Sequence, residues 1–107
     1  MKLIHTLDEF EEAINSSQLV VVDFFATWCP PCNDIAPEVE KLAEEFPNVI
    51  FLSVDVDNEE TAELHGKDRY NVNSMPTFVF LKNAKVLDRI VGPNGVDPLK
   101  EIIQKFL

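Results

Sequence analysis

The chain has 107 residues, of which 46% are hydrophobic and 26% are charged, and its formal net charge is −10. These values are ordinary for a soluble globular protein and predict one domain over residues 1–107. The acidic excess argues against nucleic acid as a partner, because phosphate contacts need clustered Lys and Arg. No apolar run reaches the length of a membrane span, and the first ten residues lack the apolar run of a signal peptide. We therefore expect a cytoplasmic protein that binds no membrane.

The spacing of apolar residues predicts an alternation of strands and helices along the chain. In order, we expect a strand at 2–4, a helix beginning after Thr6, a strand at 19–25, a helix ending near Phe46, a strand at 49–56, a helix at 59–64, strands at 77–81 and 85–91, and a final helix after Gly95. Thr6 and Glu9 have the spacing of a capping box. The order βαβαβ followed by ββα predicts an α/β fold whose mixed five-stranded sheet carries helices on both faces.

The stretch from Leu19 to Cys32 is the most informative part of the chain. Residues 19–25 are typical of a strand buried on both faces, and Cys29-Pro-Pro-Cys32 stands where the next helix begins. Cys29 is therefore expected at a helix N-terminus, where the partial positive charge stabilises a thiolate. We expect the Cys29 sulfur to project past the helix end, open to attack, and the Cys32 sulfur to be shielded one turn inside. Cysteines three residues apart around a first turn can close a disulfide without backbone movement.

Redox chemistry is the favoured role of this pair, because a disulfide that closes so short a loop adds little stability. In this interpretation Cys29 is the nucleophile and Cys32 is the resolving thiol. Two alternatives stay open: an inert buried pair, and half of a metal site or cluster shared between two chains. Within the chain we expect no metal, because zinc usually takes four ligands, and His5 and His65 lack ligand spacing.

Asp23 interrupts a strand that is otherwise apolar. Burying a carboxylate is costly unless the protein gains something from it. Asp23 therefore either lies at a wetter edge or is satisfied by a neighbour, or it is a buried carboxyl that exchanges a proton with Cys32. Burial would raise the pKa of this carboxyl by desolvation.

Three motifs resemble those of the thioredoxin family, in the same order and over essentially the whole chain: Val-Asp-Phe-Phe-Ala-Thr-Trp-Cys-Pro-Pro-Cys at 22–32, Phe-Leu-Ser-Val-Asp-Val-Asp at 51–57 and Ser-Met-Pro-Thr at 74–77. A lone Cys-x-x-Cys is a modest signal, whereas Trp-Cys-x-Pro-Cys with a distant Met-Pro-Thr is a specific one. The resemblance implies the thioredoxin fold and a protein-disulfide reductase that carries electrons. It implies no bound cofactor, with electrons coming from NADPH through a thioredoxin reductase.

The resemblance also implies roles for individual residues. Asp23 stands where the family has its aspartate, and the Met75–Pro76 peptide is expected to be cis and to lie beside the cysteines. The backbone before Pro76 would pair with an extended substrate, Trp28 would form the rim of the docking surface, and Gly92 would allow partner backbone to approach closely. The plainer alternatives are a core tryptophan, a strand-initiating proline and an ordinary turn glycine.

The active-site sequence departs from the usual Cys-Gly-Pro-Cys of the family. Pro30 and Pro31 both lack an N–H, so only amides from Cys32 onward can donate to the Cys29 sulfur. Pro30 also stiffens the loop. After Cys32, where thioredoxins often have a basic residue, come Asn33 and Asp34, which remove a charge that favours the thiolate and add one that opposes it. We expect a Cys29 pKa above that of a Gly-Pro, Lys-flanked relative, and a fall in that pKa on Pro30→Gly. Tryparedoxins and nucleoredoxins also use Cys-Pro-Pro-Cys, but this chain lacks room for their extra segments.

Partners implied by the resemblance are a thioredoxin reductase and disulfide-containing proteins such as peroxiredoxins and reductases, and we expect the chain to be a monomer. A disulfide oxidase or isomerase is a second enzyme hypothesis, which the missing signal peptide disfavours. A binding adaptor, whose cysteines only switch a docking surface, is the third.

The segment before Pro76 is about four residues longer than the family pattern. We place the extra residues near His65-Gly-Lys-Asp68, without a role.

Overall fold

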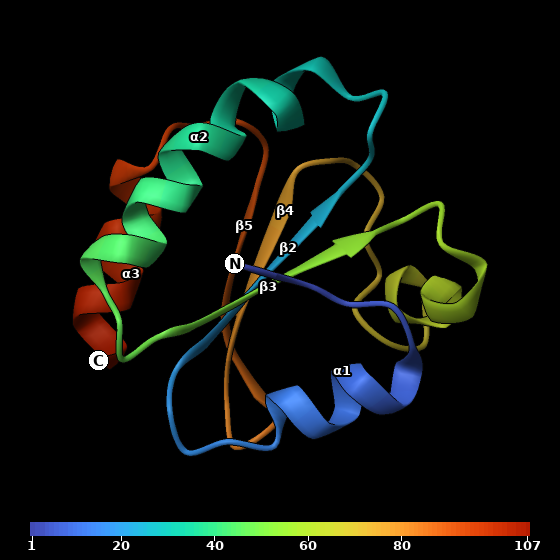
Figure 1. The fold of residues 1–107 in the computed structure, drawn as a ribbon, viewed down its shortest axis with the longest axis horizontal. Coiled ribbons are helices and arrows are strands. Elements are labelled where there is room, and N and C mark those ends of the chain that lie inside the picture. The colour runs from blue at the N-terminus through green and yellow to red at the C-terminus, as the bar shows by residue number, and fades with distance from the viewer.

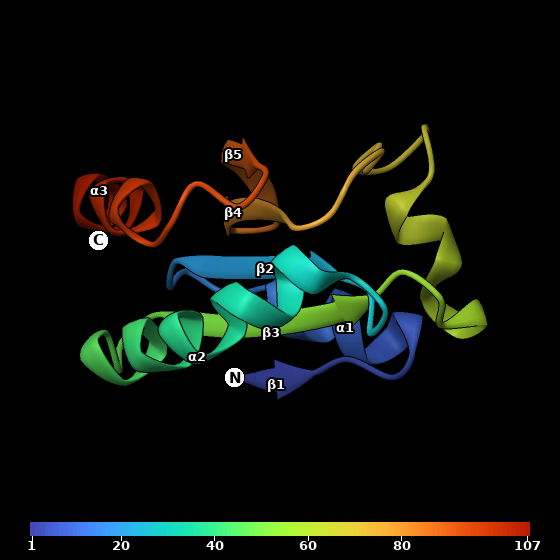
Figure 2. The ribbon, with the colours of Figure 1, turned by 90° about the horizontal axis from the view of Figure 1, so that it is seen from above.

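The computed structural model describes residues 1–107, which form a five-stranded sheet with helices on both faces (Figures 1 and 2). The elements are β1 (Lys2–Leu3), α1 (Leu7–Ile14), β2 (Val20–Phe25), α2 (Pro30–Glu45), β3 (Ile50–Asp55), the 3₁₀ helix η1 (Glu59–His65), β4 (Thr77–Lys82), β5 (Lys85–Val91) and α3 (Asp97–Phe106). The predicted order of strands and helices is confirmed, with boundaries that shift by one or two residues. No helix has both the length and the apolar character needed to cross a bilayer.

The sheet has the strand order β1-β3-β2-β4-β5, which makes β2 the central strand. β1 and β2 run parallel to β3, whereas β4 runs antiparallel to both β2 and β5. The predicted mixed sheet is therefore confirmed. Because β2 has a neighbour on each side and helices above and below, its side chains are buried along nearly its whole length. Its carboxyl end leads directly into the cysteine segment.

Two apolar layers lie on opposite faces of the sheet. Figure 1 shows α2 and α3 on one side of the strands and α1 on the other. The first packs α1 and η1 on the sheet through Phe10, Ile14 and Leu64. The second packs α2 and α3 through Ile35, Val39, Leu42, Leu99 and Ile103. Successive residues of β2 alternate between the layers, so that Val20, Val22 and Phe24 face the first and Leu19 and Val21 face the second. This double burial fixes both faces of the strand that carries Asp23.

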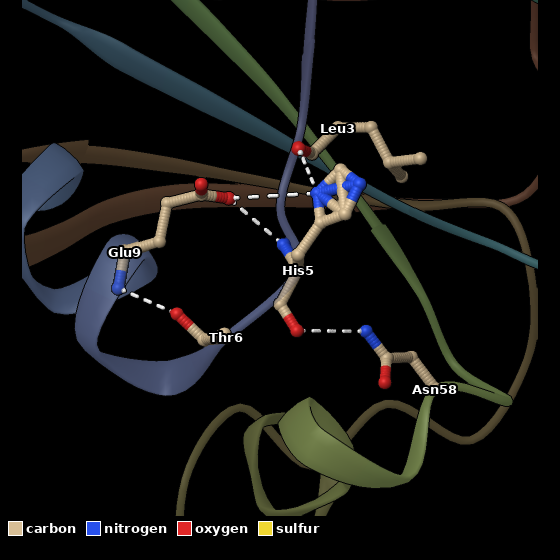
Figure 3. A network of polar contacts seen from close by, with 5 residues as sticks. All are labelled: Leu3, His5, Thr6, Glu9 and Asn58. Carbon is tan, nitrogen blue, oxygen red and sulfur yellow. Dashed lines mark hydrogen bonds and ion pairs between the residues drawn. The ribbon is translucent and has the colours of Figure 1, made fainter.

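The start of α1 shows the predicted cap, with one difference (Figure 3). Thr6 is extended, and its Oγ1 accepts the Glu9 N–H at 3.1 Å. The Glu9 carboxylate does not return to the Thr6 N–H; its Oε1 accepts the His5 N–H at 2.8 Å instead. The second hydrogen bond of the capping box therefore comes from the residue before the N-cap, His5, and not from Thr6 itself. It still ties the β1–α1 connection to the first turn of α1.

The third predicted helix is a 3₁₀ helix and not an α-helix. Asn58 caps it, accepting the Glu60 N–H at 3.0 Å. Its buried side chains are Thr61 and Leu64, three residues apart. In a 3₁₀ helix residues i and i+3 lie directly in line, so this geometry directs both side chains toward the core.

The segment after η1 folds into a compact turn held by backbone hydrogen bonds. The Asn71 N–H donates to Gly66 O at 2.8 Å, and the Tyr70 N–H donates to Leu64 O at 3.1 Å. Tyr70 is buried, and its ring packs on Phe10 and Phe24, with centroids 5.9 and 5.8 Å away. The segment with the expected extra residues therefore contributes an aromatic side chain to the α1 face.

Candidate active site

The two cysteines lie where β2 passes into α2. Cys29 is the N-cap of α2, with φ −93° and ψ 106°, and its Sγ accepts the Cys32 N–H at 3.3 Å. The pair is joined as a disulfide, with Cα atoms 5.3 Å apart. Pro30 and Pro31 occupy the first two helical positions, where neither can donate a hydrogen bond. The Cys32 amide is therefore the first donor available to the Cys29 sulfur.

Burial of the pair differs from the expectation. Cys29 and Cys32 are each only 5% exposed, so the idea of one open and one shielded cysteine is wrong for the disulfide form. Both pack in a small cluster with Ala26, and the partly buried Phe25, Val56 and Met75 pack against this cluster. The reason is the approach of a segment 46 residues away: Cys29 Sγ lies 3.8 Å from the Met75 carbonyl oxygen. Exposure of Cys29 is thus limited by a neighbouring loop, which the sequence around the cysteine does not reveal.

That loop carries the cis Met75–Pro76 peptide, as the resemblance implied. A hydrogen bond from the Thr77 hydroxyl to Ser74 O, 2.7 Å long, closes the loop ahead of β4. Gly92 joins the same place, because its N–H donates to Pro76 O at 2.9 Å. Its φ of +98° lies in a region that side-chain-bearing residues rarely adopt, which explains glycine at this position.

Asp23 lies in the middle of β2, directly opposite Ser53 of β3 and Phe78 of β4. It is only 6% exposed, so the wetter-edge alternative does not hold. No protein group donates to its Oδ1. Burial disfavours the charged carboxylate and raises the pKa of Asp23 from 3.8 to about 7. A carboxyl with this pKa can both accept and release a proton near neutral pH.

A cavity of about 170 Å³ joins Asp23 to Cys32. Its polar lining comes from Asp23, Cys32, Asn33 and Ser53, and its apolar lining includes Phe25 and Ala36. A water molecule occupies about 30 Å³ of liquid, so the cavity has room and polar partners for water. Asp23 and Cys32, which the sequence predicted to exchange a proton, therefore line one cavity that is large enough for water.

Trp28 lies on the surface beside Cys29 and is 65% exposed, so the core alternative for this side chain is excluded. Its indole N–H donates to Asp57 Oδ2 at 2.7 Å. The sequence analysis placed Asp57 in the motif at 51–57 and gave it no role beside Trp28. The signal that could have identified it is its place just after a strand parallel to β2, since carboxyl ends of parallel strands meet at one edge of a sheet.

Asn33 makes two contacts that the sequence did not predict. Its side-chain N–H donates to Thr27 O at 3.2 Å, which ties the first turn of α2 to the loop that carries the cysteines. Asn33 also lines the Asp23 cavity. No group of three His, Cys, Asp or Glu side chains is arranged to hold a metal ion.

Comparisons with known proteins agree with this geometry. The thioredoxin family model matches residues 1–105. Thioredoxin 1 of Plasmodium falciparum is 40% identical over 106 residues, covering 99% of this chain and 97% of the relative. Thioredoxin-1 of Saccharomyces cerevisiae is 45% identical over 89 residues, covering 83% of this chain and 82% of the relative.

A solved structure gives the same result. The X-ray structure of Fasciola hepatica thioredoxin superposes with a TM-score of 0.88 at 46% identity, covering 100% of both chains. The predicted thioredoxin fold is thereby confirmed, and the cysteine pair at the start of α2 has the Cys-x-x-Cys spacing expected of such an active site. The chain therefore belongs to the thioredoxin family of thiol-disulfide oxidoreductases.

Proposed function

We propose that this protein reduces disulfides of other proteins, cycling between the Cys29–Cys32 disulfide and two thiols. The observation that carries the proposal is the disulfide at the N-terminus of α2, in which Cys29 Sγ accepts the Cys32 N–H. In the reduced protein the same amide and the helix dipole favour a thiolate on Cys29. The thiolate is the form that attacks a disulfide.

Cys29 acts first in the proposed reaction. Its thiolate attacks one sulfur of the substrate disulfide, forming a mixed disulfide and releasing the other substrate sulfur as a thiolate that takes a proton from solvent. Although Cys29 itself is nearly buried, its neighbours Trp28 and Pro30 are exposed. A partner therefore approaches from the side that these two residues flank.

Cys32 completes the reaction with the help of Asp23. The Cys32 thiol loses its proton through the shared cavity to the Asp23 carboxylate, and the resulting thiolate attacks Cys29 Sγ. The mixed disulfide breaks, the Cys29–Cys32 disulfide forms, and the second substrate sulfur leaves as a thiolate that is then protonated. The substrate gains two electrons and the protein loses two. A pKa of about 7 suits Asp23 to this exchange near neutral pH.

Docking in this proposal uses the surface around the cysteines. Trp28 supplies an exposed aromatic rim, and the cis Met75–Pro76 peptide leaves the backbone before it next to the Cys29 sulfur. Gly92, hydrogen-bonded to Pro76, adds a position without a side chain where partner backbone can come close. An extended segment of a disulfide-containing protein fits these features, and peroxiredoxins and reductases are the substrate classes we propose.

A thioredoxin reductase recharges the protein by returning two electrons to the Cys29–Cys32 disulfide, as the family implies. We propose NADPH as the source of those electrons and a monomer as the working form. The chain needs no bound cofactor of its own for this exchange, since both sulfurs and the proton acceptor are its own side chains.

Insulin-disulfide reduction in the presence of a thioredoxin reductase tests the proposal, with Cys32→Ser as the decisive variant. We expect turnover by the native protein and a trapped mixed disulfide on Cys29 in Cys32→Ser, detected by intact mass. In a chain that keeps Cys32, Asp23→Asn should slow the attack of Cys32 on the mixed disulfide by at least about tenfold, because the general base is lost. Slow turnover that is insensitive to Cys32→Ser would contradict the reductase and favour a binding adaptor.

A further inference from the structure

The exposed ring of Trp28 is oriented by one polar contact. Its indole N–H donates to Asp57 Oδ2 at 2.7 Å, and the side chain makes no other hydrogen bond. A ring that is 65% exposed has few packing contacts to hold it. The direction in which Trp28 stands beside Cys29 is therefore set by the position of Asp57.

Asp57 is itself exposed and follows the last residue of β3 by two positions. Its N–H donates to the Asp55 carboxylate at 2.9 Å, which shapes the turn locally. The start of the turn is tied to the sheet, because the Val56 N–H donates to Phe25 O at 2.9 Å. The Asn58 N–H closes the turn by donating to Asp55 O at 3.0 Å, so that a contact from Asn58 to another element would hold the end of the turn and Asp57 within it.

Asn58 supplies that contact with both ends of its side-chain amide, and Figure 3 shows the end that reaches His5. Its Nδ2 donates to His5 O at 3.1 Å, across 53 positions of sequence, and its Oδ1 accepts the Glu60 N–H at 3.0 Å. The acceptor is itself held, because the His5 N–H donates to Glu9 Oε1 at 2.8 Å. One side chain thus joins the turn that carries Asp57, the first turn of η1 and the β1–α1 connection.

We propose that Asn58 is a positioning residue for partner docking, acting through Asp57 on Trp28. It lies outside the cysteine pair and the cavity at Asp23. The clamp to His5 keeps Asp57 in place, and Asp57 keeps the indole in the orientation that a partner meets beside Cys29. This role rests on the proposed function, in which Trp28 forms the rim of the docking surface.

Asn58→Ser tests the clamp while keeping the helix cap. Serine is a good N-cap residue, but its side chain is too short to reach His5 O. Because Trp28 is the only tryptophan of the chain, fluorescence anisotropy reports on this ring alone. We expect a lower Trp28 anisotropy and a KM for a protein disulfide raised about fivefold, the equivalent of one lost hydrogen bond. We expect kcat to stay within about twofold, because the sulfurs and Asp23 are untouched.

Thr6→Ala is the matched control. It removes a cap from α1 in the same network but leaves the bonds from Asn58 to His5 and to Glu60 in place. We expect native anisotropy and native KM in this variant. If Asn58→Ser behaved like Thr6→Ala, with reduced thermal stability but unchanged anisotropy and KM, Asn58 would be a structural cap only and the inference would be overturned.

Two further outcomes separate this inference from the function on which it rests. A lowered anisotropy with an unchanged KM would also overturn the inference, since the orientation of the indole would not matter to docking. Trp28→Ala with an unchanged KM would instead refute the docking role of Trp28 in the proposed function.

Discussion

The N-termini of α1 and α2 have the same geometry. Thr6 begins α1 from an extended conformation, with φ −135° and ψ 161°, and its Oγ1 accepts the Glu9 N–H at 3.1 Å. Cys29 begins α2 from an extended conformation, with φ −93° and ψ 106°, and its Sγ accepts the Cys32 N–H at 3.3 Å. In both helices the cap receives the amide three residues later. The same local device therefore serves structure in one helix and chemistry in the other.

What surrounds each cap explains the different roles. The first turn of α1 carries Asp8 and Glu9, whose charges offset the positive end of the helix dipole. The first turn of α2 carries no acidic residue and has two prolines instead. At the start of α2 the Cys29 cap can itself carry the negative charge that the helix dipole favours, because a thiol can ionise near neutral pH whereas a hydroxyl cannot. A helix N-cap is therefore reactive where its side chain can ionise and where no acidic residue of the first turn already offsets the helix dipole.

Replacing the thiol cap of α2 by a hydroxyl cap like that of α1 should have the largest effect on reductase turnover. Cys29→Ser places a hydroxyl cap on α2, which keeps the hydrogen bond to the Cys32 amide but removes the nucleophile. We expect reductase turnover to fall by at least about 10³-fold. The free energy of unfolding under reducing conditions should stay within about 1 kcal/mol of native. Thr6→Ser, the control exchange at α1, should leave turnover unchanged, and residual fast turnover in Cys29→Ser would show that Cys29 is not the nucleophile.

The second difference between the helix ends is the buried carboxyl near α2, and its effect depends on pH. Because the pKa of Asp23 is raised to about 7, the folded protein keeps a proton that the unfolded chain releases above pH 3.8. The contribution of Asp23 to the free energy of unfolding therefore falls as pH rises from about 4 to about 7, by up to about 4 kcal/mol, and does not change further above that range.

Asp23→Asn should remove this pH dependence. Urea unfolding is expected to show the variant more stable than native at pH 8 by a few kcal/mol, and similar to native at pH 4. Asp34→Asn, which changes an exposed carboxylate on α2, is the control and should show a far smaller difference between the two pH values. An equal stability difference for Asp23→Asn at both pH values would show that desolvation of the charge is not the cause.

Removing the α1 cap should have a moderate and purely structural effect. Thr6→Ala leaves the Glu9 N–H without its side-chain acceptor and should lower the free energy of unfolding by about 1 kcal/mol. Reductase turnover should be unchanged, because α1 lies on the sheet face opposite α2. Thermal unfolding and the insulin assay measure the two quantities. A loss of turnover in proportion to the loss of stability would contradict the separation of roles between the two helix ends.

We expect the smallest effect from the two prolines at the start of α2, which differ in how far each limits hydrogen bonding to Cys29. A cap side chain accepts from the second or third helical amide, and Pro31 holds the second position whereas Pro30 holds the first. Pro31→Ala should therefore add a donor to the Cys29 thiolate and lower its pKa. Pro30→Ala, the matched control, should lower it less. Thiolate absorbance titrations of the reduced proteins measure both, and an equal effect of the two variants would refute the amide argument.

This geometry also refines the expectation for Pro30→Gly. Sequence reasoning attributed a raised Cys29 pKa to the missing N–H of Pro30. In the structure Pro30 is at the first helical position, which N-cap side chains seldom use as a donor. The lost donor that matters at α2 is then at Pro31, and only the observed helix register makes that distinction.

Much of the fold and of the candidate site was predictable because its signals are local. Apolar periodicity located the strands and helices, Thr6 and Cys29 marked helix starts, and a carboxyl within an apolar strand marked Asp23. The failures involve contacts between distant segments. Cys29 is partly covered by the distant Met75, the indole of Trp28 is hydrogen-bonded to Asp57, and Asn58 is hydrogen-bonded to His5.

The residues that can do the chemistry are evident from the chain alone: two cysteines around one helical turn, next to a strand that carries an aspartate. Periodicity and capping act over a few residues, so they can be deduced from neighbours in the chain. The accessibility of Cys29, the cavity between Asp23 and Cys32, and the orientation of Trp28 follow only from the folded arrangement of distant segments. These depend on the strand order β1-β3-β2-β4-β5, which brings loops far apart in sequence to the same edge of the sheet.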